Sequence, residues 1–123
     1  NTYRYADADV NTFLGGGNEG SIVTNGGITG GIQTLSGPGA INLTTLYTEL
    51  TTTGADAFSL ANGAAGQIKI ITLLVEGGTA TITPTTFSNG TSITMDAAND
   101  SVSMIYGTNG WQIFAAQAIT VNA

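Results

Sequence analysis

Cysteine and histidine are both missing from the 123 residues of this chain. Without them the chain cannot form a disulfide, a Ser-His-Asp or Cys-His catalytic system, or the usual zinc site of His and Cys ligands. Its only lysine, Lys69, does not follow the glycines of a phosphate-binding loop. These absences exclude most hydrolase mechanisms, and we predict a protein that is not an enzyme, with no catalytic residues and no cofactor.

Charged side chains are also scarce, at 8% of the chain, against about 25% in an average globular domain. Two cations, Arg4 and Lys69, face eight carboxylates, which gives a net charge of −6. This excess of negative charge repels phosphate backbones and anionic lipid headgroups, so we expect neither nucleic acid nor a membrane as a partner. No apolar run approaches the length of a membrane-spanning helix.

Two short motifs match ligand-binding loops only in part. Residues 15–20 follow the glycine spacing of a dinucleotide site, but the sequence after them predicts no helix to direct its N-terminus at a pyrophosphate. Residues 7–18 begin like a calcium loop, yet Thr12 stands where that loop needs Gly and Asn18 where it needs Glu. Neither motif predicts a binding site.

Acidic and amide side chains gather at one predicted turn, which holds Asp96, Asn99 and Asp100. Such oxygen ligands bind cations, but Asn and Asp also favour turns because they hydrogen-bond to nearby backbone groups. A catalytic carboxylate pair needs a cleft that raises one pKa, whereas carboxylates at a turn are normally solvated. We interpret the three residues as turn formers and predict no metal site, with cation binding as the alternative.

Turn dipeptides recur in the second half of the chain, between short runs rich in Ile, Val, Thr and aromatic residues. Asn-Gly supplies the positive φ angles of tight hairpin turns, so the pattern predicts a set of β-hairpins. The one helix candidate, residues 44–52, is rich in β-branched Thr and is not predicted to be helical. The dipeptides are Asn62-Gly63, Gly77-Gly78, Asn89-Gly90, Asn99-Asp100 and Asn109-Gly110. Strands are expected at 41–47, 57–60, 67–75, 79–83, 92–96, 101–106, 111–115 and 118–121.

The predicted strand at residues 67–75 differs from the others because both of its faces are apolar. One face carries Ile68, Ile70 and Leu74. In a domain this small, a strand that is apolar on both faces needs cover from a partner subunit or from the N-terminal segment. We therefore expect an oligomer. The predicted subunit interface consists of Lys69, Ile71, Leu73 and Val75.

Glycine is concentrated in residues 15–40, which hold ten of the eighteen glycines. This segment has no sustained period of a strand or a helix, so it cannot form a regular layer by itself. We interpret residues 1–40 as an extended Gly-rich arm that lies over another surface, with a flexible linker as the alternative. Residues 41–123 are expected to form the β-sandwich domain. The predicted anchors of the arm are Phe13, Leu14, Ile22 and Val23.

The region from residue 57 to residue 111 combines several motifs. In this combination it resembles a small β domain of virion structural proteins from tailed bacteriophages, especially phages of marine bacteria and cyanobacteria. The residues that carry the resemblance are Phe58-x-Leu60, Gly66-Gln67-x-Lys69-x-Ile71, Pro84-x-x-Phe87, Gly90-x-x-Ile93-Thr94, Asp100-Ser101-Val102, Tyr106 and Gly110-Trp111.

Such domains occur as capsid decoration (cement) proteins and as modules of tail fibres or spikes, commonly as trimers. The resemblance implies a structural role and assigns no active-site residues. Residues 1–40 lie outside it, and an arm suits a capsid-attached protein better than a module of a long fibre. We expect an antiparallel β-sandwich of jelly-roll type that forms a homotrimer, binds the major capsid protein and lies on the outer capsid surface of the virion.

Two other functions stay open from the sequence. One is a receptor-binding tail-fibre or spike module, and the other is a carbohydrate-binding surface module. A sugar platform would use Trp111, but this residue shares a strand face with Ile113 and Ala115 and is expected in the core. The location of labelled protein on the particle separates a decoration protein from a fibre module.

Overall fold

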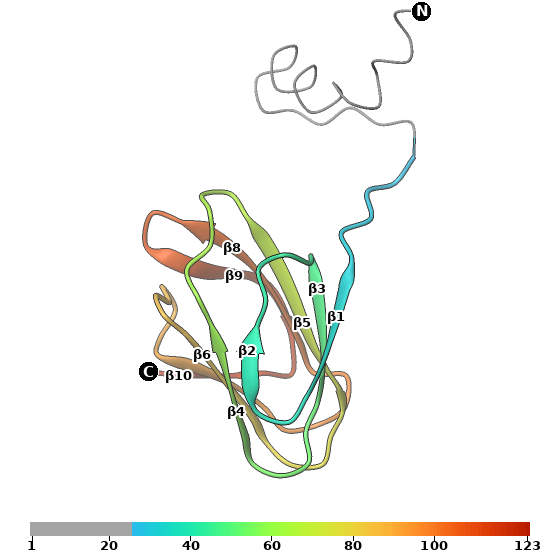
Figure 1. The fold of residues 1–123 in the computed structure, drawn as a ribbon. Helices are drawn as coiled ribbons and strands as arrows, with labels where there is room; N and C mark the ends of the chain where they lie inside the picture. Colours follow the sequence, from blue (N-terminus) through green and yellow to red (C-terminus); the bar gives the residue numbers. More distant parts are fainter. Residues whose placement is uncertain (1–25) are drawn as a thin grey trace, which may run out of the picture.

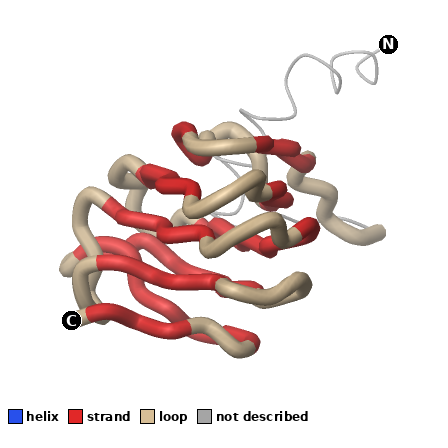
Figure 2. Tube along the Cα trace, turned by 90° about the horizontal axis from the view of Figure 1, so that it is seen from below, coloured by secondary structure: helices blue, strands red, loops and turns tan. Residues whose placement is uncertain are grey.

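The computed structural model describes residues 26–123 and consists of two β-sheets packed face to face (Figure 1). The strands are β1 (Ile32–Ser36), β2 (Gly39–Ile41), β3 (Tyr47–Thr51), β4 (Asp56–Leu60), β5 (Ile68–Val75), β6 (Ala80–Pro84), β7 (Ser92–Met95), β8 (Ser101–Gly107), β9 (Gly110–Gln117) and β10 (Thr120–Asn122). Sheet A has the order β1-β3-β5-β8-β9, and sheet B has the order β10-β7-β6-β4-β2. Strands and loops make up the described residues (Figure 2), and none of these residues forms a helix that would cross a membrane. The predicted all-β sandwich is confirmed.

The first six strands wind as a short solenoid. The chain alternates between the sheets, so that odd-numbered strands enter sheet A and even-numbered strands enter sheet B. Each strand from β3 to β6 pairs in parallel with the strand two places earlier, as β1–β3–β5 and β2–β4–β6. In-register pairing places Leu35, Leu50 and Leu73 in one row across sheet A. Equivalent side chains of successive coils therefore stack on one another, as in repeat proteins.

The last four strands close the sandwich with antiparallel pairs. β7 pairs with β6 and β10 pairs with β7 in sheet B, while β8 pairs with β5 and β9 pairs with β8 in sheet A. Four of the eight strand pairings are therefore parallel, whereas a jelly roll pairs its strands antiparallel. This topology corrects the expected antiparallel jelly roll.

The turn dipeptides lie at strand ends, but only some of them join hairpin neighbours. Asn89-Gly90 and Asn109-Gly110 connect strands that pair antiparallel. The other three, Asn62-Gly63, Gly77-Gly78 and Asn99-Asp100, connect strands of different sheets. A tight-turn signal specifies a local reversal of the backbone, and it does not specify which sheet the next strand joins.

The sandwich begins earlier than predicted, because β1 and the first two residues of β2 lie inside the segment that was assigned to the arm. Gly31 and Gly37, with φ of 78° and 74°, bound β1 at its two ends. The two apolar residues of β1, Ile32 and Leu35, lie on opposite faces of the strand, so β1 shows no alternation of apolar and polar residues in the sequence. Residues 42–46, expected to be part of a strand, instead form the connection from β2 to β3.

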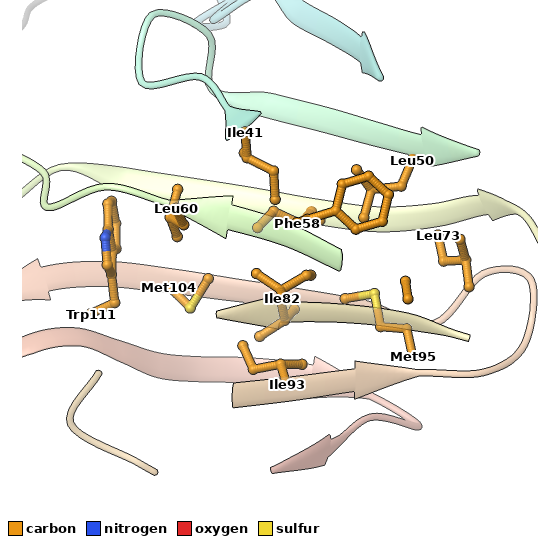
Figure 3. Packing of buried hydrophobic residues seen from close by; sticks show 13 residues of the cluster. Ile41, Leu50, Phe58, Leu60, Leu73, Ile82, Ile93, Met95, Met104 and Trp111 are labelled. Atoms are coloured by element: carbon orange, nitrogen blue, oxygen red, sulfur yellow. The ribbon is translucent and has the colours of Figure 1, made fainter. Parts of the chain in front are cut away.

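The core lies between the two sheets (Figure 3). Trp111 is fully buried, as expected, and its Nε1–H donates a hydrogen bond to the carbonyl oxygen of Ala61 at 2.8 Å. The Tyr106 ring meets the Trp111 ring edge to face, with centroids 5.2 Å apart. Ala115 lies beyond a register shift in β9 and is exposed, so it does not share the buried face of Trp111. The buried apolar residues are Ile41, Leu50, Phe58, Leu60, Ile71, Leu73, Ala80, Ile82, Ile93, Met95, Val102, Met104 and Trp111.

Two connections between the sheets touch at Gly78, where an added Cβ would meet the backbone of Gly54. We predict that Gly78→Ala lowers the free energy of unfolding by about 2 kcal/mol or more, because backbone atoms must move to admit the methyl group. Gly107→Ala is the matched control, since a Cβ there meets nothing within 4 Å. Urea denaturation followed by Trp111 fluorescence measures both, and equal stability of the two variants would contradict the packing described here.

Candidate association surface

The outer face of sheet A, which points away from sheet B, carries an apolar patch. Tyr47 lies between Ile32 on β1 and Ile70 on β5 in one row across the strands. In the next row, Ile68 on β5 pairs with Ile105 on β8. Ile32, Ile68 and Ile105 are 61%, 41% and 37% exposed, and Tyr47 and Ile70 are half-buried. We call these five residues the apolar patch.

The residues of β5 show why the patch faces outward. Side chains of a strand alternate between its two faces. Lys69, Ile71 and Leu73 are fully buried against sheet B. Ile68 and Ile70 stand at the intervening positions and therefore point to the opposite side. Packing of one face of β5 into the core leaves the other apolar face on the surface.

The outer face of sheet B has a different chemistry. Thr81, Thr94 and Thr120 form a row across β6, β7 and β10. All other outward positions of this sheet are small or uncharged polar residues, so large apolar side chains on the outer faces are concentrated on sheet A. These other positions are Ala40, Ala57, Ser59, Thr83, Ser92 and Asn122.

The structure corrects the subunit interface expected from the sequence. Lys69, Ile71 and Leu73 are fully buried inside the sandwich, so they are not available to a second subunit. Only Val75 of the expected set is exposed, at 52%. Both faces of β5 are apolar as predicted, but sheet B of the same subunit covers the face that was assigned to the partner. The apolar patch was missed because nothing in the sequence shows which face of β5 turns inward.

Lys69 is a buried cation that uncharged oxygens surround. Its Nζ donates hydrogen bonds to Asn42 Oδ1 at 3.2 Å, to the Thr45 carbonyl oxygen at 2.9 Å and to Thr45 Oγ1 at 3.0 Å. Asn42 Oδ1 also accepts hydrogen bonds from the backbone N–H and the hydroxyl of Thr45. The ammonium group thereby fixes the connection between β2 and β3. Burial lowers the pKa of Lys69 from 10.5 to about 8, because desolvation penalises the charged form.

The lowered pKa of Lys69 predicts that stability rises with pH between about 8 and 10.5. In this range the unfolded chain still binds the proton that the folded protein has released, so raising the pH favours folding. The expected gain in the free energy of unfolding between about pH 7 and about pH 10 is about 2 to 3 kcal/mol, because a difference of one pKa unit between the folded and unfolded states corresponds to about 1.4 kcal/mol. Denaturation at about pH 7 and about pH 10 measures it, with Lys69→Met as the variant that should lack the rise. A wild-type stability that is constant or falls in this range would contradict the prediction.

Gln67 and Trp111, which like Lys69 are among the residues that carry the resemblance to virion domains, also hold loops in place. Gln67 Nε2 donates a hydrogen bond to the Leu43 carbonyl oxygen at 2.9 Å, and Gln67 Oε1 accepts one from the Ala64 N–H at 2.9 Å. Gly63 lies so close to Trp111 that an added Cβ would be 2.8 Å from Cζ2 of the indole. These contacts give the motif residues a role in fixing the loops at one end of the sandwich.

The acidic turn is organised by its own backbone. Asp100 is 4% exposed rather than solvated, and its Oδ2 accepts hydrogen bonds from the N–H groups of Asp96 and Ala97, both at 3.1 Å. Asn99 adopts a positive φ of 76°. This geometry fits the interpretation as turn formers. Within residues 26–123, no group of three or more acidic residues is placed to hold a metal ion.

No family model matches the chain, and a search of curated proteins found no match either. The resemblance to phage virion proteins therefore stays a prediction. The expected arm anchors, Phe13, Leu14, Ile22 and Val23, lie outside the described residues.

Proposed function

We propose that the protein is a non-enzymatic structural protein that acts by association, as a homotrimeric decoration protein on the outer surface of a phage head. The observation that carries this proposal is the apolar patch on sheet A. Contiguous apolar side chains on one outer face, opposite a face of small polar residues, are typical of a protein interaction site. The resemblance of residues 57–111 to virion domains supports the choice of a virion among possible assemblies.

The size of the face suits an interface between subunits. Five strands about 4.8 Å apart, with about 3.3 Å per residue, give a sheet face of about 400 to 600 Å². A specific interface buries about 800 Å² on each partner. The outer face of sheet A therefore supplies most of the area that a stable contact needs, and neighbouring loops supply the remainder.

The charge distribution permits a second copy of the chain as the occupant of this face. Copies with a net charge of −6 repel one another over most of their surfaces. Glu49 is the only charged side chain at the outward positions of sheet A. Contact through the apolar patch therefore brings few like charges together. The outer face of sheet B is uncharged, so the apolar side chains, and not the charges, favour sheet A.

We predict that Ile105→Glu converts the trimer to a monomer, because the new carboxylate must be desolvated among apolar side chains. Leu74→Glu is the matched control, since Leu74 is an exposed apolar residue of sheet A outside the patch, at 42% exposure compared with 37% for Ile105. Light scattering at micromolar concentration measures the mass. A monomeric wild-type protein, or a trimer that persists in Ile105→Glu, would overturn association through the patch.

We also predict that deleting residues 1–25 leaves the sandwich folded but abolishes binding to undecorated phage heads. The ten strands of residues 26–123 and the core that they enclose lie outside the deleted segment, so we expect the sandwich to fold without it. Circular dichroism checks the fold, and cosedimentation with heads measures binding. Binding by the truncated protein would show that the arm is not the anchor, and failure of the full-length protein to bind would overturn the decoration role.

A further inference from the structure

Sheet A ends on one side at β1, and no strand of residues 26–123 covers this edge, which we call the open edge of β1. β1 bonds to β3 through odd-numbered residues, since the Gly37 N–H donates to the Thr51 carbonyl oxygen at 2.9 Å and the Gly31 carbonyl oxygen accepts from the Tyr47 N–H at 3.3 Å. Successive residues of a strand direct these groups to opposite sides. The N–H and C=O groups of Thr34, at the centre of β1, therefore point away from β3. Within residues 26–123, no strand pairs with that side of β1.

The neighbouring edge in sheet B is closed by a side chain. Gln33 Nε2 donates to the Ala40 carbonyl oxygen at 3.3 Å, and Gln33 Oε1 accepts from the Asn42 N–H at 2.9 Å. The amide of Gln33 thus occupies the position of a neighbouring strand beside β2. Natural sheets usually protect their edges in such ways, and an unprotected edge is a template for an added strand. By contrast, no such cover stands beside the open edge of β1 in residues 26–123, so this edge is available to an added strand.

The segment before the described residues has the composition of a suitable strand. Residues 21–24 read Ser-Ile-Val-Thr, which is uncharged and rich in β-branched side chains, with Gly20 before them. Residues 26–29 are exposed, and Figure 1 shows the chain before β1 leading away from the sandwich. Residues 26–29 therefore leave the edge of β1 uncovered.

We propose that the open edge of β1 binds residues 21–24 of a second copy as an added β-strand. This inference rests on the proposed self-association and deepens it, because it assigns Ile22 and Val23 to a neighbouring copy instead of the capsid. Each copy donates one strand and accepts another, so the contact is head to tail. Such contacts form a closed ring when the rotation between copies closes, and a trimer is the smallest ring beyond a dimer.

Cysteine cross-linking tests this proposal, because the natural chain contains no cysteine. Full-length Val23→Cys and Thr34→Cys proteins are prepared separately, mixed to exchange subunits, and treated with a short bismaleimide. We expect a cross-linked dimer that contains one chain of each variant, identified by mass spectrometry. The double variant, treated at high dilution, reports pairing within one chain. Cross-links confined to single chains, or no cross-link between positions 23 and 34, would overturn the proposal.

A proline variant tests the edge itself. Thr34→Pro removes the outward N–H of β1 without removing a hydrogen bond to β3, and proline is tolerated on edge strands. Thr34→Ala keeps this N–H and is the matched control. For this test one protein carries Val23→Cys, and the other carries Ser36→Cys together with Thr34→Pro or Thr34→Ala. We expect about tenfold less cross-linking between copies with Thr34→Pro, because one backbone hydrogen bond is lost and the proline ring blocks the added strand. Equal cross-linking in both variants would overturn strand addition.

Association through the apolar patch and strand addition at β1 are distinguished by these experiments. If the wild-type protein is trimeric and Ile105→Glu dissociates it, but no cross-link forms between copies, association through the apolar patch stands and strand addition is wrong. If the wild-type protein is monomeric, self-association fails, and strand addition fails with it.

Discussion

The parallel, in-register pairing of β1, β3 and β5 is the constraint on which the rest of the molecule depends. Once Leu35, Leu50 and Leu73 share one row, the two-residue period of a strand decides the side of the residues before them, up to the register shift that follows Leu50 and Leu73. It places Ile71 in the core and Ile70 on the surface. It also places Lys69 on the inward side, on the same face as Ile71.

The burial of Lys69 is therefore a consequence of strand register, and the surrounding loop compensates for it. An unpaired ammonium group inside a protein is costly, and hydrogen bonds to oxygen atoms reduce this cost. Asn42 and Thr45 supply these oxygens from the connection between β2 and β3. The same contacts hold that connection against the end of the sandwich. Lys69 therefore serves the fold of its own subunit.

The two outer faces of the sandwich differ in the polarity of their side chains. Sheet B presents Thr, Ser, Ala and Asn side chains, whereas sheet A presents the apolar patch, and the open edge of β1 belongs to sheet A as well. Both features that favour contact with another copy thus lie on one sheet. A structural protein built this way leaves sheet B free to face solvent or another component of the assembly.

Sequence reasoning located most strands from β4 onward, because their alternation is regular and turn residues separate them. It missed β1 and β2, which lie in a Gly-rich segment without a sustained period, and it missed all of β3 except Tyr47. It also missed the parallel pairing, because turn dipeptides do not specify the sheet of the next strand. The interface prediction failed at β5 for a related reason. Both faces of β5 are apolar, so the sequence does not show which face turns inward, and the face chosen as the interface is the buried one.

The most direct test of the account is an experimental structure of the associated protein, by crystallography or electron microscopy of the particle. The account predicts that Ile68 and Ile105 of one copy are buried against a second copy, while Thr81, Thr94 and Thr120 stay outside that contact. A structure in which copies meet through the outer face of sheet B, with the apolar patch exposed to solvent, would contradict it.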